Sequence, residues 1–122
     1  MRKLKIDLTG KDATFLSNTN RYCNGLFNLE LYRTRPDKVP SLEQLKEGIN
    51  RFQLAYEAAL NGDRVEASKR KKARTDLTAM FEKALHFLES VADEDDIPAL
   101  LQAGFEVPRA ARRKTMIAPS TG

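Results

Sequence analysis

Residues 41–63 read SLEQLKEGINRFQLAYEAALNGD and carry the clearest structural signal in the chain. Ser41 followed by Gln44 forms a capping box, which is typical of a helix start. Apolar residues then recur three or four positions apart, which predicts a helix over residues 41–60 with one buried face, made of Leu42, Leu45, Ile49, Phe52, Tyr56 and Ala59. The closing Asn-Gly-Asp supplies a C-cap glycine and a new N-cap, and therefore predicts a helical hairpin.

A longer helix is predicted to follow, from Asp63 to about Ala92, with a length of about 45 Å at 1.5 Å per residue. Its first half has few apolar side chains between Glu66 and Lys72, so we expect that end to project past the core or to lie at its rim. Gly48, inside the preceding helix, suggests close approach of another helix, because glycine there costs about 1 kcal/mol relative to alanine. The second half of the long helix has an apolar face made of Ala73, Leu77, Met80, Phe81, Ala84, Leu88 and Val91.

Another helix is predicted before the hairpin, from Asp12 as a plausible N-cap to a point near Asn28. Residues 29–40 contain two prolines and are predicted to form a linking loop. The apolar face of this first helix comprises Phe15, Leu16, Thr19, Tyr22, Cys23, Leu26 and Phe27.

The two ends of the chain have different patterns. Apolar and charged residues alternate over residues 3–8, which is typical of a short strand or an extended arm. The sequence shows no strong partner strand, so we expect this arm to lie on helices or to pair with another chain. Asp96 is predicted to cap a short helix that ends at Gly104. Residues 106–122 have no sustained periodicity and are predicted to be a basic tail.

These elements together predict an all-α fold, an antiparallel bundle of three longer helices plus a short fourth, with an extended N-terminal arm and a C-terminal tail. The predicted boundaries are 1–11 for the arm, 12–105 for the bundle and 106–122 for the tail. A chain of 122 residues with 41% hydrophobic and 31% charged residues should bury one core, and this composition argues against a chain disordered throughout.

The composition also favours a cytoplasmic location. Cys23 is the single cysteine, so no intramolecular disulfide is possible and a reducing compartment fits. The basic N-terminus meets Asp7 and Gly10 before an apolar segment can form, so we expect no signal peptide. No run of about 18 apolar residues is present, so we expect no membrane span. The net charge of +4 is a mild excess, and the placement of the charges is more informative than their sum.

Short motifs occur in the following order: Pro40-Ser41-Leu42, Ile49-Asn50-Arg51-Phe52-Gln53, Asn61-Gly62-Asp63, Lys72-Ala73-Arg74, Leu77 and Gln102-Ala103-Gly104-Phe105. In this order they resemble an unnamed family of small bacterial helical-bundle domains, some of which are followed by fibronectin type III-like domains. The resemblance covers about half of the chain, and the short helix closing on Ala-Gly-Phe is its most diagnostic part. It implies a helical bundle, and it implies no activity, cofactor or binding residues.

Candidate catalytic residues are sparse. His86 is the single histidine, and no cysteine or second histidine stands at metal-ligand spacing, so a structural or solvent-facing role is favoured. Cys23 lies on an apolar face, where a free cysteine behaves as a small hydrophobe. Residues 93–96 are acidic but lack the pattern of a calcium loop, and helix capping explains them. Phosphate-binding glycine loops and recognisable nucleophile arrangements are absent from the sequence. We therefore expect no enzymatic activity, no cofactor and no metal.

Two basic clusters supply the candidate interaction residues. A helix that reads a nucleic-acid groove would interleave Asn, Gln or aromatic side chains, which the first cluster lacks. A solvated basic rim or a dock for an acidic partner is therefore favoured over contact with a nucleic-acid backbone. The first cluster comprises Lys69, Arg70, Lys71, Lys72 and Arg74, and the second comprises Arg109, Arg112, Arg113 and Lys114, beside the apolar Met116 and Ile117.

The sequence thus predicts a non-catalytic structural or protein-interaction module, a subunit or adaptor of a larger assembly that contacts no membrane. Self-association is one form of this hypothesis, because the basic residues 64–74 and the acidic residues 89–96 lie toward opposite ends of one helix. The alternative is a nucleic-acid-associated protein that contacts the phosphate backbone through the basic clusters, with an affinity that falls steeply as salt rises.

Overall fold

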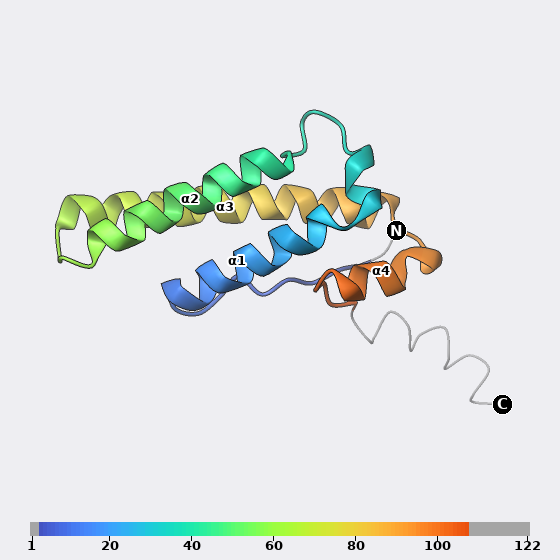
Figure 1. Cartoon of the computed structure of the whole chain (residues 1–122), viewed down its shortest axis with the longest axis horizontal. Helices are drawn as coiled ribbons and strands as arrows, with labels where there is room; N and C mark the ends of the chain where they lie inside the picture. The colour runs from blue at the N-terminus through green and yellow to red at the C-terminus, as the bar shows by residue number, and fades with distance from the viewer. Residues whose placement is uncertain (1–2, 108–122) are drawn as a thin grey trace.

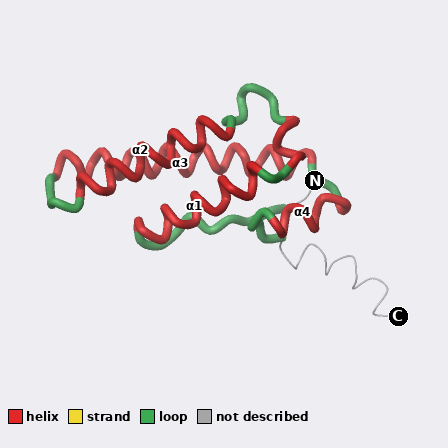
Figure 2. The backbone as a smooth tube through the Cα atoms, viewed as in Figure 1, coloured by secondary structure: helices red, strands yellow, loops and turns green. Residues whose placement is uncertain are grey.

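The computed structural model describes residues 3–107 (Figure 1). Figure 2 shows this part of the chain as helices joined by loops, which confirms the predicted all-α bundle of three longer helices and a short fourth. The predicted tail residues Arg109, Arg112, Arg113, Lys114, Met116 and Ile117 lie outside the described residues. The helices are α1 (Asp12–Phe27), α2 (Leu42–Ala59), α3 (Arg64–Val91) and α4 (Ile97–Gln102), with short 3-10 helices η1 (Glu30–Thr34) and η2 (Glu94–Asp96).

The α2–α3 pair forms the predicted antiparallel hairpin (Figure 1). The capping box at the start of α2 is complete, because the Ser41 amide donates to Gln44 Oε1 at 2.8 Å and the Gln44 amide donates to Ser41 Oγ at 3.1 Å. A Cβ at Gly48 would lie 3.0 Å from Leu77 Cδ1 and 3.2 Å from the Met80 sulfur. The glycine therefore lets α3 approach α2 closely, as the sequence suggested.

The core lies where α1 packs against the inner part of the hairpin. The rings of Phe15 and Phe52 meet edge to face with centroids 5.0 Å apart, and the Tyr22 ring stacks on Phe105 at 5.7 Å. Such aromatic pairs add to the stability that burial alone gives. None of the helices within residues 3–107 is both long and apolar enough to cross a membrane.

Two residues expected on buried faces are exposed. Phe27 is 54% exposed and Val91 is 42% exposed. Each is the last residue of its helix, and the chain leaves the helical path directly afterwards. The buried positions at these points are instead Leu29 and Ala92. Continuing the helical periodicity to the final residue of each helix was therefore wrong.

The segment from 29 to 40, predicted as a linking loop, contributes to the core. It contains η1, and Leu29, Tyr32 and Val39 are buried. The Tyr32 hydroxyl donates a hydrogen bond to the Pro40 carbonyl, and burial raises the pKa of Tyr32 to about 12. Arg35 Nη1 donates to the Val39 carbonyl at 3.0 Å. The segment is therefore packed and hydrogen-bonded, although its apolar residues have no helical period.

The N-terminal arm finds its partner in the residues that follow α4. Lys5 and Glu106 form an antiparallel bridge with N–O distances of 2.8 and 2.9 Å. Leu4 is buried, and its amide donates to Glu89 Oε2 at 2.9 Å. Val107 is buried as well, so the packed part of the chain continues past residue 105, the predicted end of the bundle.

Of the two predicted helix caps, the first lies one residue earlier in the structure, and the second has the predicted residue but a different side-chain bond. Lys11 occupies the N-cap of α1, and the carboxylate of Asp12 is used elsewhere. Asp96 is the N-cap residue of α4, but its Oδ2 accepts the Asp93 amide at 3.0 Å and caps η2 instead. The acidic run is therefore a capping structure in which Asp93 caps η2, and Asp96 takes the predicted N-cap position of α4 without a side-chain hydrogen bond to that helix.

Candidate interaction surfaces

The basic cluster on α3 divides into two groups with different roles. Arg70 and Arg74 are one helical turn apart, so their side chains leave the same face of α3. Both reach Asp12 at the start of α1, with Arg70 Nη1 2.7 Å from Oδ2 and Arg74 Nη1 2.8 Å from Oδ1. We call Asp12, Arg70 and Arg74 the arm clasp.

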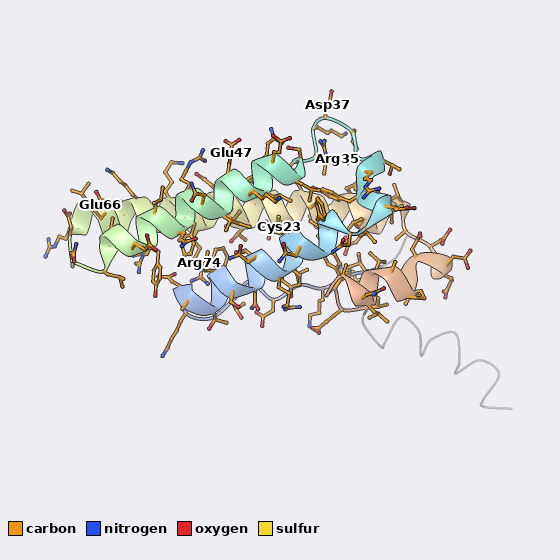
Figure 3. The ribbon with its side chains drawn as sticks, in the orientation of Figure 1. Cys23, Arg35, Asp37, Glu47, Glu66 and Arg74 are labelled. Atoms are coloured by element: carbon orange, nitrogen blue, oxygen red, sulfur yellow. The ribbon has the colours of Figure 1, made fainter. Side chains whose placement is uncertain are left out.

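The arm clasp also fixes the chain just before α1. Arg74 Nη2 donates to the Gly10 carbonyl at 2.9 Å and to the Leu8 carbonyl at 3.3 Å. Its guanidinium lies 4.4 Å from the centroid of the Phe15 ring, where a cation is attracted to the ring face. Figure 3 shows Arg74 between the hairpin and α1. Arg70 and Arg74 therefore hold the fold together, and placing them on an open basic rim was wrong.

The three lysines of the cluster remain at the surface. Lys69 pairs with Glu66 at 3.4 Å and Lys72 pairs with Asp76 at 3.2 Å, and these are solvent-exposed pairs of the kind that contributes little to stability. Lys71 is exposed. The sequence did not separate these lysines from the two arginines, because the partner Asp12 lies far away along the chain.

An apolar groove runs between the outer parts of α2 and α3, with a volume of about 510 Å³. Its apolar residues are small except for Leu54, which is 59% exposed. Past the groove, at the hairpin tip, Leu60 and Val65 are 68% and 61% exposed. We call this the hairpin groove; it is lined by Arg51, Leu54, Ala55, Ala58, Glu66, Lys69, Lys72, Ala73 and Asp76.

A second groove, of about 590 Å³, lies between α3 and the loop that joins η1 to α2. Figure 3 marks this loop by Arg35 and Asp37. The apolar wall contains Phe87, whose ring meets Tyr32 edge to face at 6.1 Å, and the exposed Val91. We call this the loop groove; it is lined by Pro36, Lys38, Val39, Lys83, His86, Phe87, Ser90 and Val91.

Cys23 and His86 are the remaining candidate residues from the sequence. Cys23 is buried, and burial raises the pKa of its thiol. His86 is exposed at the edge of the loop groove. Among residues 3–107, no group of three or more His, Cys, Asp or Glu side chains is placed to hold a metal ion.

Comparison with known proteins gives no match to a family model, to a curated protein or to a solved structure. The resemblance to small bacterial helical-bundle domains therefore stays a prediction.

Sequence reasoning did not find either groove. Leu54 lies off the predicted buried face of its helix, and an apolar residue at such a position was the available signal. Lys38 and Lys83 are far apart in the sequence, and they line one groove only because the loop between η1 and α2 lies against α3.

Proposed function

We propose that this chain is a non-catalytic protein-interaction module, a subunit that pairs with a second copy of itself through the hairpin groove. One observation carries the proposal: the outer part of the hairpin extends beyond the start of α1 (Figure 1), and its apolar groove is open to solvent. Two helices with a floor of alanines leave room for another helix to approach closely. Fully burying a leucine or valine side chain contributes about 1.5 to 3 kcal/mol, so covering the exposed parts of Leu54 and Val65 in both copies would contribute to pairing.

The charges on the rim favour a second copy over a strongly charged partner. Glu66 and Asp76 stand beside Lys69 and Lys72, so the rim carries both signs within a few ångströms. A surface of mixed sign can meet a copy of itself with opposite charges adjacent, whereas a surface of one sign repels its copy. The buried thiol of Cys23 agrees with a subunit that works in the cytoplasm.

The alternative function, contact with a nucleic-acid backbone, has less support. It needs a cluster of cations free to meet phosphates. Arg70 and Arg74 are held by one carboxylate at 2.7 and 2.8 Å, and their side chains are largely covered. Lys69 and Lys72 each have a carboxylate alongside. This arrangement weakens the electrostatic field that a phosphate backbone would meet.

The test is the mass of the full chain in solution, measured by light scattering across a series of concentrations. We expect the mass to rise from 13.8 kDa toward twice that value as concentration increases. Leu54→Glu should keep the chain monomeric, because it places a charge in the apolar groove. Leu101→Glu is the matched control, because Leu101 is 48% exposed on α4 and lines neither groove. A wild-type chain that stays monomeric at every concentration would contradict the proposal.

A further inference from the structure

The loop groove combines apolar walls with a basic edge. Its apolar lining comes from Pro36, Val39, Phe87 and Val91, while Lys38 and Lys83 stand at its edge. Among the described residues, the side chains that line this groove include no carboxylate, while Asp37 and Glu47 line a second hollow that shares the same two lysines. The two lysines and His86 are exposed, so their polar ends are available to a ligand. The hairpin groove differs, because carboxylates stand beside its lysines.

From this arrangement we propose that the loop groove binds an acidic segment of a partner protein, in which an apolar side chain is flanked by carboxylates. The apolar side chain enters between Val91 and Phe87, and the flanking carboxylates meet Lys38 and Lys83. The proposal rests on the proposed function only in that both assign this chain to protein binding. It adds a second surface and states the chemistry of the partner that the surface accepts.

Charge complementarity selects this occupant over the other segments that could reach the groove. The chain's own residues 109–114 carry three arginines and a lysine, so they would bring like charge to Lys38 and Lys83. A second copy offering the same groove would meet it with like charge as well, which disfavours self-pairing here. An acidic segment removes this repulsion and gives each lysine a partner.

The apolar walls favour a peptide over a nucleic acid. Proteins that bind single strands stack bases on exposed aromatic rings. Two aromatic rings line this groove: that of Phe87 packs edge to face against the buried Tyr32 and is itself partly buried, so the small imidazole of His86 is the exposed one. Val39 and Val91 are aliphatic and branched, and they suit an aliphatic or aromatic side chain better than a stacked base.

The proposal is tested by selecting a display library of random peptides on the immobilised full chain, followed by fluorescence anisotropy with the selected peptides. We expect enrichment of peptides in which acidic residues flank one large apolar residue. The double variant Lys38→Glu, Lys83→Glu should weaken their binding about tenfold or more, because two charge pairs become repulsive. Val91→Ser should also weaken binding, because it removes an apolar contact from an exposed position and leaves the core intact.

The matched control is Arg64→Glu, Lys71→Glu, which makes the same change in net charge at exposed positions of α3 outside both grooves. This control should bind the selected peptides as the wild type does. Circular dichroism on each variant shows whether the helices are retained.

Three results would overturn the proposal: no enrichment of acidic peptides, equal binding by all variants, or binding of a fluorescent oligonucleotide through Lys38 and Lys83 in place of peptides. Leu54→Glu should leave peptide binding unchanged, because it lies in the other groove. Loss of self-pairing with retained peptide binding would therefore contradict only the role of the hairpin groove, and the reverse result would contradict only this inference.

Discussion

The inner and outer parts of the α2–α3 hairpin have different surroundings. Phe52, on the inner part, is fully buried, and its ring meets Phe15 of α1 at 5.0 Å. Leu54 lies two residues further along α2 and is 59% exposed. Both side chains are large and apolar, but two residues turn a helix by about 200°, so Phe52 faces α1 while Leu54 points to the opposite, uncovered side. One face of α2 therefore contributes to the core, and the other leaves apolar surface exposed.

The two grooves differ in charge in a similar way. The hairpin groove pairs its lysines with Glu66 and Asp76, while the loop groove has Lys38 and Lys83 at its edge without lining carboxylates. In our proposals, the rim of both signs suits self-pairing, and the exposed lysines of the loop groove suit a partner that carries carboxylates.

The difference between the two positions is tested most strongly by shortening the side chains of Phe52 and Leu54 in turn. Phe52→Ala should lower the free energy of unfolding by about 3 to 5 kcal/mol, because it leaves a cavity between α1 and α2. Leu54→Ala should change it by less than about 0.5 kcal/mol in the monomer, because surface substitutions away from special contacts have small effects. Urea denaturation at low protein concentration measures both values. Equal losses of unfolding free energy would mean that Phe52 and Leu54 are buried to the same extent.

A pair of truncations tests how far the covered region extends. A chain that ends at Phe105 should be less stable by about 2 to 3 kcal/mol than a chain that ends at Val107, because it loses a buried valine and the backbone pairing with Lys5. Thermal melts of the two chains, followed by circular dichroism, measure the difference. Identical melting temperatures would show that the arm does not depend on its pairing with Glu106.

The pH dependence of stability tests whether Tyr32, which packs against Phe87 of the loop groove, is buried in the folded chain. Burial raises the pKa of Tyr32 from 10.0 to about 12, so the folded chain keeps this proton in a range where the unfolded chain loses it. The free energy of unfolding should therefore fall as pH rises from about 10 to about 12, by an amount on the order of 2 kcal/mol. Tyr32→Phe should remove this contribution, and comparison of the two chains isolates it from the titration of other groups. Parallel pH profiles would mean that Tyr32 is open to solvent.

Much of the fold could be predicted because the main helices carry local signals. The capping box at Ser41, the apolar spacing through Phe52 and the close approach at Gly48 all lie within one short stretch, and the structure confirms each of them. The packed segment around Tyr32 could not be predicted in the same way. Its buried residues have no helical or alternating period, and its hydrogen bonds go to the turn before α2.

The candidate site was harder to predict, because its residues are defined by contacts distant in sequence. Arg70 and Arg74 belong to a basic run, and only the packing of α1 brings Asp12 to them. Lys38 and Lys83 become neighbours of one groove when the loop folds onto α3. Local sequence patterns report charge and helical faces, but they do not report which faces another element covers.

The most direct test of the account is an isotope-filtered NOE measurement on a mixture of ¹³C-labelled and unlabelled full chain, at a concentration where light scattering gives the mass of a dimer. The account predicts contacts between copies from the methyl groups of Leu54, Ala55 and Ala58, and none from Val91, which lies in the basic loop groove. Contacts between copies that arise from Val91, or a dimer without contacts at Leu54, would contradict the assignment of self-pairing to the hairpin groove.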